Sequence, residues 1–319
     1  MKKYYLSTCF ILASSILAIG QQLPQFTQYM INPFLYNPAV AGTEDYTDIR
    51  AGYRKQWTGF AGSPSTSVLS AHANIGKSLV TNNRSRHKKN GFHGVGGIVE
   101  NDAIGPTNTI TITGAYSYHL TITKKIFASL GASGGLQQFT MDGSKLSTYN
   151  PGDPAIASYT KTSLANINTG FWVYSDKFYV GGSLQQVVDQ KLYNMASGSV
   201  SNGSTVQHYF LMAGYRIPLG YDFTFIPSFC LKGVSAAPMQ WDINAKVRYK
   251  NILWAGISYR HQDAVAAMVG VIVNNMFDIS YSYDYTTSAI GLYSGGSHEI
   301  MIGYRLTTKS RVICPSNFW

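Results

Sequence analysis

The sequence predicts an all-β protein: a transmembrane antiparallel β-barrel of about 14 strands with an N-terminal periplasmic or plug segment. Three observations predict this fold class. Apolar and polar residues alternate with a period of two along most of the chain, which is the pattern of β-strands. Charged residues form only 13% of the 319 residues, about half of the share that is usual for a soluble domain. The chain also begins with a segment typical of exported proteins.

Residues 1–20 are predicted to be a signal peptide. Lys2 and Lys3 supply the positive charge that precedes the apolar core of such a peptide, and residues 6–19 supply that core. The apolar stretch is too short to span a bilayer as a helix. Small residues at its end fit a cleavage site, so we expect the mature chain to start at Gln21.

The alternation is clearest in residues 277–285. Phe277, Ile279 and three tyrosines would line one face of a strand there, while Asp278, Asp284 and two serines would line the other. A soluble β-sandwich alternates as well, with its apolar face in the core. Aromatic residues near the strand ends and charged residues in the middle of the polar faces favour a membrane barrel with a wet lumen.

Strands, turns and termini predict the topology of this barrel. We expect the barrel to span residues 45–307, followed by a periplasmic tail at 308–319. An even number of strands places both termini on the periplasmic side, with short turns there and longer loops outside, at 140–161, 189–205 and 287–296. The fourteen strands are expected at 45–56, 64–75, 93–102, 107–120, 125–139, 162–175, 178–188, 206–217, 222–233, 239–249, 252–260, 264–273, 276–286 and 297–307.

One predicted periplasmic turn, residues 76–92, is long and basic. It contains Arg84, Arg86, Lys88 and Lys89. Such a cluster is a candidate docking surface for an acidic partner. The alternatives are a solvated loop, or a loop on the other side that touches lipopolysaccharide phosphates. Basic residues elsewhere are scattered, so the net charge of +10 does not indicate a nucleic-acid partner.

A Tyr-Arg pair recurs at the ends of four predicted strands. We expect each tyrosine to face lipid at the headgroup level and each arginine to face the lumen or its rim. The pairs lie at 53–54, 215–216, 259–260 and 304–305.

Residues 21–44 differ in character from the predicted strands. Pro24, Pro33 and Pro38 exclude a central strand, yet the segment is rich in aromatic and aliphatic residues that favour burial. A periplasmic cap or a plug in the lumen fits this composition. The alternative is a packed extension that only stabilises the barrel.

The sequence offers little support for an enzyme, a metal site or a cofactor. It contains no nucleophile elbow, zinc-protease motif or phosphate-binding loop, and its seven histidines show no ligand spacing. His261 and Asp263 lie in one predicted turn, which leaves an outer-membrane hydrolase as a minor hypothesis. The mature chain would keep Cys230 and Cys314, and a disulfide and two separate thiols remain alternatives.

Four segments, two towards each end of the chain, resemble the PorP/SprF family of the type IX secretion system. The resemblance is carried by QFTQYMINPFLYNPAVAG at 25–42, GYRKQWTGFAGSPSTSVLSAH at 52–72, HEIMIGYRL at 298–306 and CPSNFW at 314–319. The resemblance implies an outer-membrane barrel of Bacteroidetes-type bacteria that works with the type IX apparatus and, in gliding species, with large surface adhesins. Family members are often paired with a secreted protein that bears a C-terminal sorting domain.

We therefore predict a non-enzymatic outer-membrane barrel of the type IX secretion system. Its expected partners are outer-membrane lipid, subunits of the secretion apparatus, and a secreted protein with a sorting domain that it helps to deliver or anchor. The alternative is a passive porin or small-molecule transporter, since fourteen strands enclose more space than side chains fill. Candidate partner-binding residues are Phe26, Gln28, Tyr29, Asn32, Asn37, Pro38, Arg54, Lys55, Gln56 and Trp57.

Overall fold

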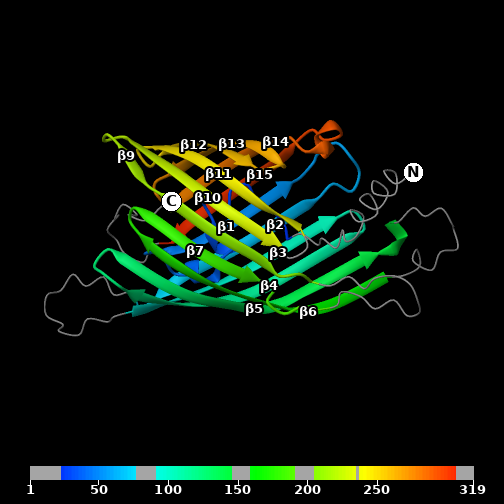
Figure 1. The fold of residues 1–319 in the computed structure, drawn as a ribbon, viewed down its shortest axis with the longest axis horizontal. Helices are drawn as coiled ribbons and strands as arrows, with labels where there is room; N and C mark the ends of the chain where they lie inside the picture. The colour runs from blue at the N-terminus through cyan, green and yellow to red at the C-terminus, as the bar shows by residue number, and fades with distance from the viewer. Residues whose placement is uncertain (1–22, 77–90, 146–158, 191–204, 235–236, 307–319) are drawn as a thin grey trace, which may run out of the picture.

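A computed structural model describes residues 23–76, 91–145, 159–190, 205–234 and 237–306. The predicted signal peptide, the basic residues at 84–89, the C-terminal tail and Cys314 fall outside these ranges. Within them, long antiparallel strands account for most of the chain (Figure 1).

The strands of the described residues follow the predicted positions closely. They are β1 Thr47–Lys55, β2 Ser65–Ile75, β3 Gly91–Ile104, β4 Thr107–Thr121, β5 Ile126–Asp142, β6 Tyr159–Ser175, β7 Phe178–Gln185, β8 His208–Tyr215, β9 Ile217–Leu219, β10 Phe223–Val234, β11 Ala237–Tyr249, β12 Leu253–Arg260, β13 Ala264–Val273, β14 Phe277–Thr286 and β15 Ser297–Leu306. Four short 3₁₀ turns accompany them: η1 Pro33–Leu35, η2 Pro38–Val40, η3 Gly143–Lys145 and η4 Ala289–Leu292.

The sheet closes on itself. Each strand pairs antiparallel with its neighbour in sequence, and β1 pairs with β15 from Thr47 opposite Leu306 to Lys55 opposite His298. Strands β8 and β9 both pair with β10, so they form a single strand of the wall. The structure is therefore the predicted closed antiparallel barrel of 14 strands.

The interruption between β8 and β9 has a local cause. Gly214 lies opposite Ser228 and Ile217 opposite Phe225, so the register continues unbroken through the gap and places Pro227 there. Proline has no N–H to give to the ladder. On the opposite side, towards β7, the backbone N–H of Arg216 donates to the carbonyl oxygen of Lys177 at 2.7 Å.

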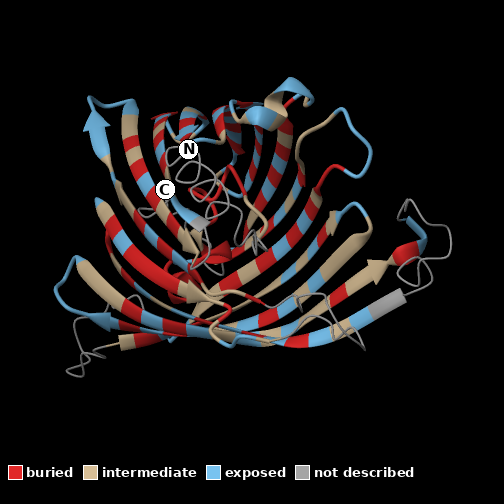
Figure 2. Ribbon diagram, turned by 45° about the vertical axis from the view of Figure 1, so that its right-hand side comes forward, coloured by how far each residue is buried: buried red, intermediate tan, exposed pale blue. Residues whose placement is uncertain are grey.

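The side chains alternate between the two faces of the wall, with the polar face inside. Along β14, Phe277 is 51% exposed and Asp278 is 2% exposed, and the alternation continues to the end of the strand. Figure 2 shows the same banding on most of the strands. An apolar outer surface and a polar interior are the reverse of a soluble β-protein and suit a wall that faces lipid.

Tyr-Arg pairs follow this alternation as predicted. Tyr53 and Tyr259 are exposed on the outside, whereas Arg54 and Arg260 are buried inside. Arg305 is also buried inside, next to the half-buried Tyr304.

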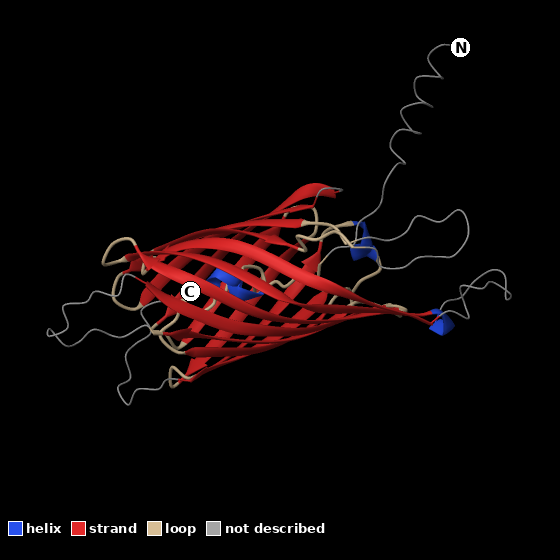
Figure 3. Ribbon diagram, turned by 90° about the horizontal axis from the view of Figure 1, so that it is seen from below, coloured by secondary structure: helices blue, strands red, loops and turns tan. Residues whose placement is uncertain are grey.

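The barrel has two distinct ends. We call the end where β1 begins and β15 finishes the terminal end, and the opposite end the distal end. Strands are joined at the terminal end by short turns, which lie at 122–125, 176–177, 220–222, 250–252 and 274–276. Asn274 and Asn275 adopt the positive φ expected of a tight hairpin, 51° and 54°. At the distal end, the long strands β4, β5 and β6 taper beyond the rest of the wall to η3 (Figure 3).

Candidate functional site in the barrel interior

The segment from Leu23 to Tyr46 lies inside the barrel and runs along its length (Figure 3). At the distal end, the backbone N–H of Leu23 donates to Nε2 of His208, at the start of β8, at 3.4 Å. Near the terminal end, the N–H of Gly42 donates to Nδ1 of His72 at 3.2 Å. The described chain thus begins at the distal end and finishes, at Leu306, at the terminal end. The segment therefore crosses the lumen from the distal end to the terminal end, where β1 begins.

Prolines shape this segment into two short turns. Pro33 and Pro38 each start a 3₁₀ turn, where the missing N–H and the fixed φ are favourable. Asn37 caps η2 by accepting a hydrogen bond from the N–H of Ala39 at 2.9 Å. Its amide also donates to the carbonyl oxygens of Phe171 at 2.9 Å and Gly182 at 3.2 Å. This one side chain therefore joins the segment to β6 and β7.

Aromatic residues fill the centre of the lumen. Tyr36 stacks on Phe210 with ring centroids 4.6 Å apart, and its hydroxyl accepts a hydrogen bond from the N–H of Phe26 at 2.9 Å. Burial raises the pKa of the Tyr36 phenol far above its usual value. Tyr36 is therefore neutral at any physiological pH and serves as a fixed packing and hydrogen-bonding group.

Four buried charged residues of the wall hold the distal part of the segment. Two carboxylates and two guanidinium groups meet there. Arg54 lies 2.8 Å from Asp284 and 3.1 Å from Glu299. Arg260 lies 3.1 Å from the same oxygen of Asp284. We call this group the distal ion cluster; it consists of Arg54, Arg260, Asp284 and Glu299.

The N-terminal segment completes the distal ion cluster. The backbone N–H groups of Thr27 and Gln28 donate to the two oxygens of Glu299 at 2.7 and 3.0 Å. The hydroxyl of Thr27 donates to Asp284 at 2.7 Å and accepts from Arg54 at the same distance. Since buried charges are tolerated only when they are paired and hydrogen-bonded, this arrangement makes the wall charges dependent on the segment.

A second set of charges lies nearer the terminal end. Arg50 reaches Asp48 at 2.9 Å and Asp278 at 3.1 Å, and Arg305 reaches Asp278 at 2.6 Å. All four side chains are at most 8% exposed. They link β1, β14 and β15 across the closing seam of the barrel.

Glycines on the inner face of the opposite wall allow the segment to approach closely. A Cβ at Gly131 would lie 2.5 Å from Cα of Ala39, and one at Gly94 would lie 1.9 Å from the carbonyl oxygen of Ala41. A Cβ at Gly170 would lie 2.2 Å from the Asn37 side chain. These distances are too short for any larger residue, so the three positions form a seat shaped to the backbone of the segment.

We expect Gly131→Val to loosen the segment. The new side chain would overlap the backbone of η2, which costs about 1–3 kcal/mol as overpacking and releases the segment from the wall. Faster proteolysis of residues 23–46 and faster solute entry into liposomes would measure the change. Gly134→Val is the matched control, because a Cβ on Gly134, in the same strand, meets nothing within 4 Å. Equal behaviour of the two variants would contradict the role of the seat.

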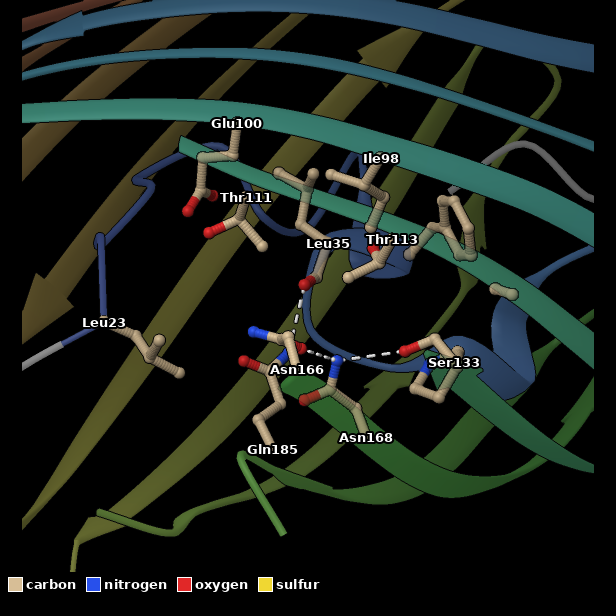
Figure 4. Close-up of a pocket in the computed structure, with 13 residues that line it drawn as sticks. Leu23, Leu35, Ile98, Glu100, Thr111, Thr113, Ser133, Asn166, Asn168 and Gln185 are labelled. Atoms are coloured by element: carbon tan, nitrogen blue, oxygen red, sulfur yellow. Dashed lines mark hydrogen bonds between the residues drawn. The ribbon is translucent and has the colours of Figure 1, made fainter. Parts of the chain in front are cut away.

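Cavities remain on both sides of the segment. One, of about 60 Å³, lies between Leu35 and the polar wall of β3 to β7 (Figure 4). Asn168 donates to Asn166 at 2.7 Å and to Ser133 at 3.0 Å in its lining. Another, of about 240 Å³, lies at the distal end and is bordered by Leu23, Tyr36, Phe210, Lys232 and Met239.

The structure places most predicted partner contacts inside the barrel. Seven of these residues are buried and contact the wall or each other: Phe26, Gln28, Tyr29, Asn32, Asn37, Pro38 and Arg54. Lys55, Gln56 and Trp57 are half-buried in the distal turn after β1. The predicted set therefore separates into an internal group, which a partner could touch only after the segment moves, and an accessible group.

The two residues considered for hydrolysis, His261 and Asp263, contact neighbouring side chains. His261 stacks on Trp241 with centroids 4.7 Å apart, and Asp263 pairs with Arg260 at 2.8 Å. No group of three His, Cys, Asp or Glu in the described ranges could hold a metal ion. Cys230 is buried and forms no disulfide within the described part of the chain. No helix among the described residues is long and apolar enough to cross a membrane.

The sequence did not reveal the glycine seat or the ion cluster. Gly94, Gly131 and Gly170 interrupt alternating strands, and a glycine inside a strand is a known sign of close backbone approach. Asp284 and Glu299 stood out only as polar-face residues, because their partners lie hundreds of positions away in the chain, at Thr27 and Arg54.

A bacterial transporter of solved structure shares this fold. The Ralstonia pickettii toluene transporter TbuX is 9% identical, with 87% of this chain and 93% of that chain covered and a TM-score of 0.52. Omp33 of Acinetobacter baumannii is 9% identical, with 83% and 100% covered and a TM-score of 0.47. No curated protein sequence is significantly similar to this chain. The fold and the polar, filled interior define an outer-membrane β-barrel.

The family of this barrel is defined by its sequence. The model of the type IX secretion system membrane protein PorP/SprF matches residues 18–304. The chain belongs to the PorP/SprF family, as the resemblance at its two ends predicted.

Proposed function

We propose that this protein is a non-enzymatic outer-membrane barrel of the type IX secretion system that binds a secreted surface protein and helps to deliver or anchor it. Family membership supports the connection to the secretion apparatus. The observation that carries the finer proposal is the segment 23–46, which fills the centre of the lumen and is bonded to walls on opposite sides.

The same observation argues against a passive pore. The N–H groups of Thr27 and Gln28 donate to Glu299 on one wall, and the amide of Asn37 donates to the opposite wall. These bonds fix the segment across the lumen, and the glycines of the seat contact η2 closely. A solute larger than water would have to displace this packing. The barrel then serves as a docking body, with the partner bound at an end of the barrel and not carried through it.

The distal end is the proposed docking end. Outer-membrane barrels carry short turns on the periplasmic side, and short turns join the described strands at the terminal end, so in this proposal the distal end faces outward. Lys55, Gln56 and Trp57 lie there, half-buried. In a gliding bacterium the partner would be a surface adhesin with a C-terminal sorting domain, and the basic residues Arg84, Arg86, Lys88 and Lys89 would face periplasmic subunits of the apparatus.

Removing the gene tests this function. We expect the loss of one or a few sorting-domain proteins from the cell surface, measured by comparing surface-exposed proteins of mutant and complemented cells. Uptake of small solutes should not change. Unchanged surface proteins together with impaired solute uptake would contradict the proposal and favour a small-molecule transporter.

A further inference from the structure

At the distal end, part of one strand edge has no described strand beside it. β6 pairs with β5 over its whole length, from Tyr159 opposite Asp142 to Ser175 opposite Ile126. Its pairing with β7 covers only Thr169 to Tyr174. β7 leaves the ladder where Gln186 adopts a positive φ of 54°. The distal part of β6 therefore has a strand on one side only, among the described residues.

The main-chain groups that face this open edge follow from the antiparallel pattern, in which alternate residues point to the same side. The carbonyl oxygen of Ile167 accepts a hydrogen bond from the N–H of Val187 at 3.0 Å on this side. Ala165 points the same way, and Ser163 and Lys161 follow it. No described strand pairs with Ser163 or Lys161 on this side, and both side chains are exposed.

A side-chain amide already takes the place of a peptide group on this edge. The Oε1 of Gln190 accepts from the N–H of Ala165 at 2.9 Å, and its Nε2 donates to the carbonyl oxygen of Ala165 at 2.6 Å. This is the pair of bonds that a neighbouring strand would form. The edge at Ala165 thus has the geometry to hold a peptide, and a single flexible side chain occupies it.

The open edge lies outside the lipid-facing band. The outward residues Phe171 and Ile167 are apolar and exposed, as a lipid-facing surface requires, whereas Ser163 and Lys161 further along are polar. An unpaired strand edge in water is a site for strand addition. Here it is carried by the strands that taper beyond the rest of the barrel (Figure 3).

We infer that the β6 edge from Tyr159 to Ala165 binds an extended segment of the secreted partner as an added β-strand, with displacement of the Gln190 amide. The inference rests on the proposed function and names the mode by which the partner is held. Main-chain hydrogen bonds supply the binding, and Lys161, the one charged side chain on this edge, favours an acidic residue beside it.

The test uses the intact barrel in detergent and the purified sorting domain of the secreted protein whose display depends on it. Ser163→Pro removes the N–H of residue 163 that faces the open edge, and it leaves the hydrogen bonds to β5 in place. Proline is tolerated on a strand edge. We expect binding to weaken roughly tenfold. Ser163→Ala keeps the N–H and should bind as the unaltered chain does. Gln190→Ala frees the edge and should tighten binding.

The outcomes separate the inference from the function. Slower deuterium exchange of the Lys161 and Ser163 amides in the complex would support strand addition. Equal binding by the unaltered chain and Ser163→Pro would overturn the inference and leave the function intact. Absence of binding by the unaltered chain would overturn both. A dimer of this chain that Ser163→Pro abolishes, with partner binding unchanged, would assign the edge to a second copy instead.

Discussion

Deletion of residues 22–42 is expected to convert a closed barrel into a steadily conducting pore that no longer displays its partner. The segment contributes the aromatic packing and the hydrogen bonds that cross the lumen. A wall of fourteen strands leaves a channel when nothing fills it. Planar-bilayer recordings should show a conductance at least about tenfold above that of the full-length chain, because a barrel of fourteen strands is wider than the eight-stranded barrels that side chains alone can fill.

The control for this deletion is a chain in which residues 22–42 are replaced by a Gly/Ser sequence of equal length. Such a linker keeps the connection to β1 but has neither the aromatic rings nor the bonds to Glu299, so it should conduct as the deletion does. A deletion variant that inserts in the membrane, stays closed and still displays the partner would refute the role of the segment in both closure and docking.

Asp284→Ala is expected to be the most destabilising single substitution in the interior. Asp284 accepts from Arg54 at 2.8 Å, from Arg260 at 3.1 Å and from the Thr27 hydroxyl at 2.7 Å. Its removal leaves two buried guanidinium groups short of counter-charge, which costs about 3–5 kcal/mol. Urea unfolding of the barrel in detergent micelles, followed by tryptophan fluorescence, measures the change.

Asp222→Ala supplies the matched control. Asp222 also pairs with a basic residue, Lys250, at 3.6 Å, but both side chains are about half exposed at the terminal end. A pair of this kind contributes little because water already solvates both charges. We expect no measurable shift in the unfolding midpoint. Similar shifts for Asp284→Ala and Asp222→Ala would show that the distal ion cluster does not hold the interior together.

The wall of the barrel could be predicted because it depends on local pattern. Side chains alternate with every residue in a strand, so the sequence around Phe277 and Asp278 already separates the lipid face from the lumen. The turn at Asn274 and Asn275 was predictable for the same reason, since a tight hairpin needs residues that accept positive φ.

The interior could not be predicted to the same depth. The contacts of Thr27 with Asp284 and of Gln28 with Glu299 join positions more than 250 residues apart in the chain, and no local pattern encodes which inward-facing residues meet. The sequence indicated that residues 21–44 would be buried. It named Phe26, Tyr29 and Asn37 as candidate partner contacts. In the structure Tyr29 and Asn37 are hydrogen-bonded to the barrel wall, and Phe26 to Tyr36 within the segment.

The sequence by itself determined the apolar outside, the polar inside and the fourteen strands of this barrel, because period and turn chemistry are local properties. Only the tertiary structure decided that the N-terminal segment passes back through the lumen, that wall charges and segment stabilise each other, and that β6 is left with an open edge. These depend on closure of the sheet, which brings distant residues together at distances that no stretch of sequence specifies.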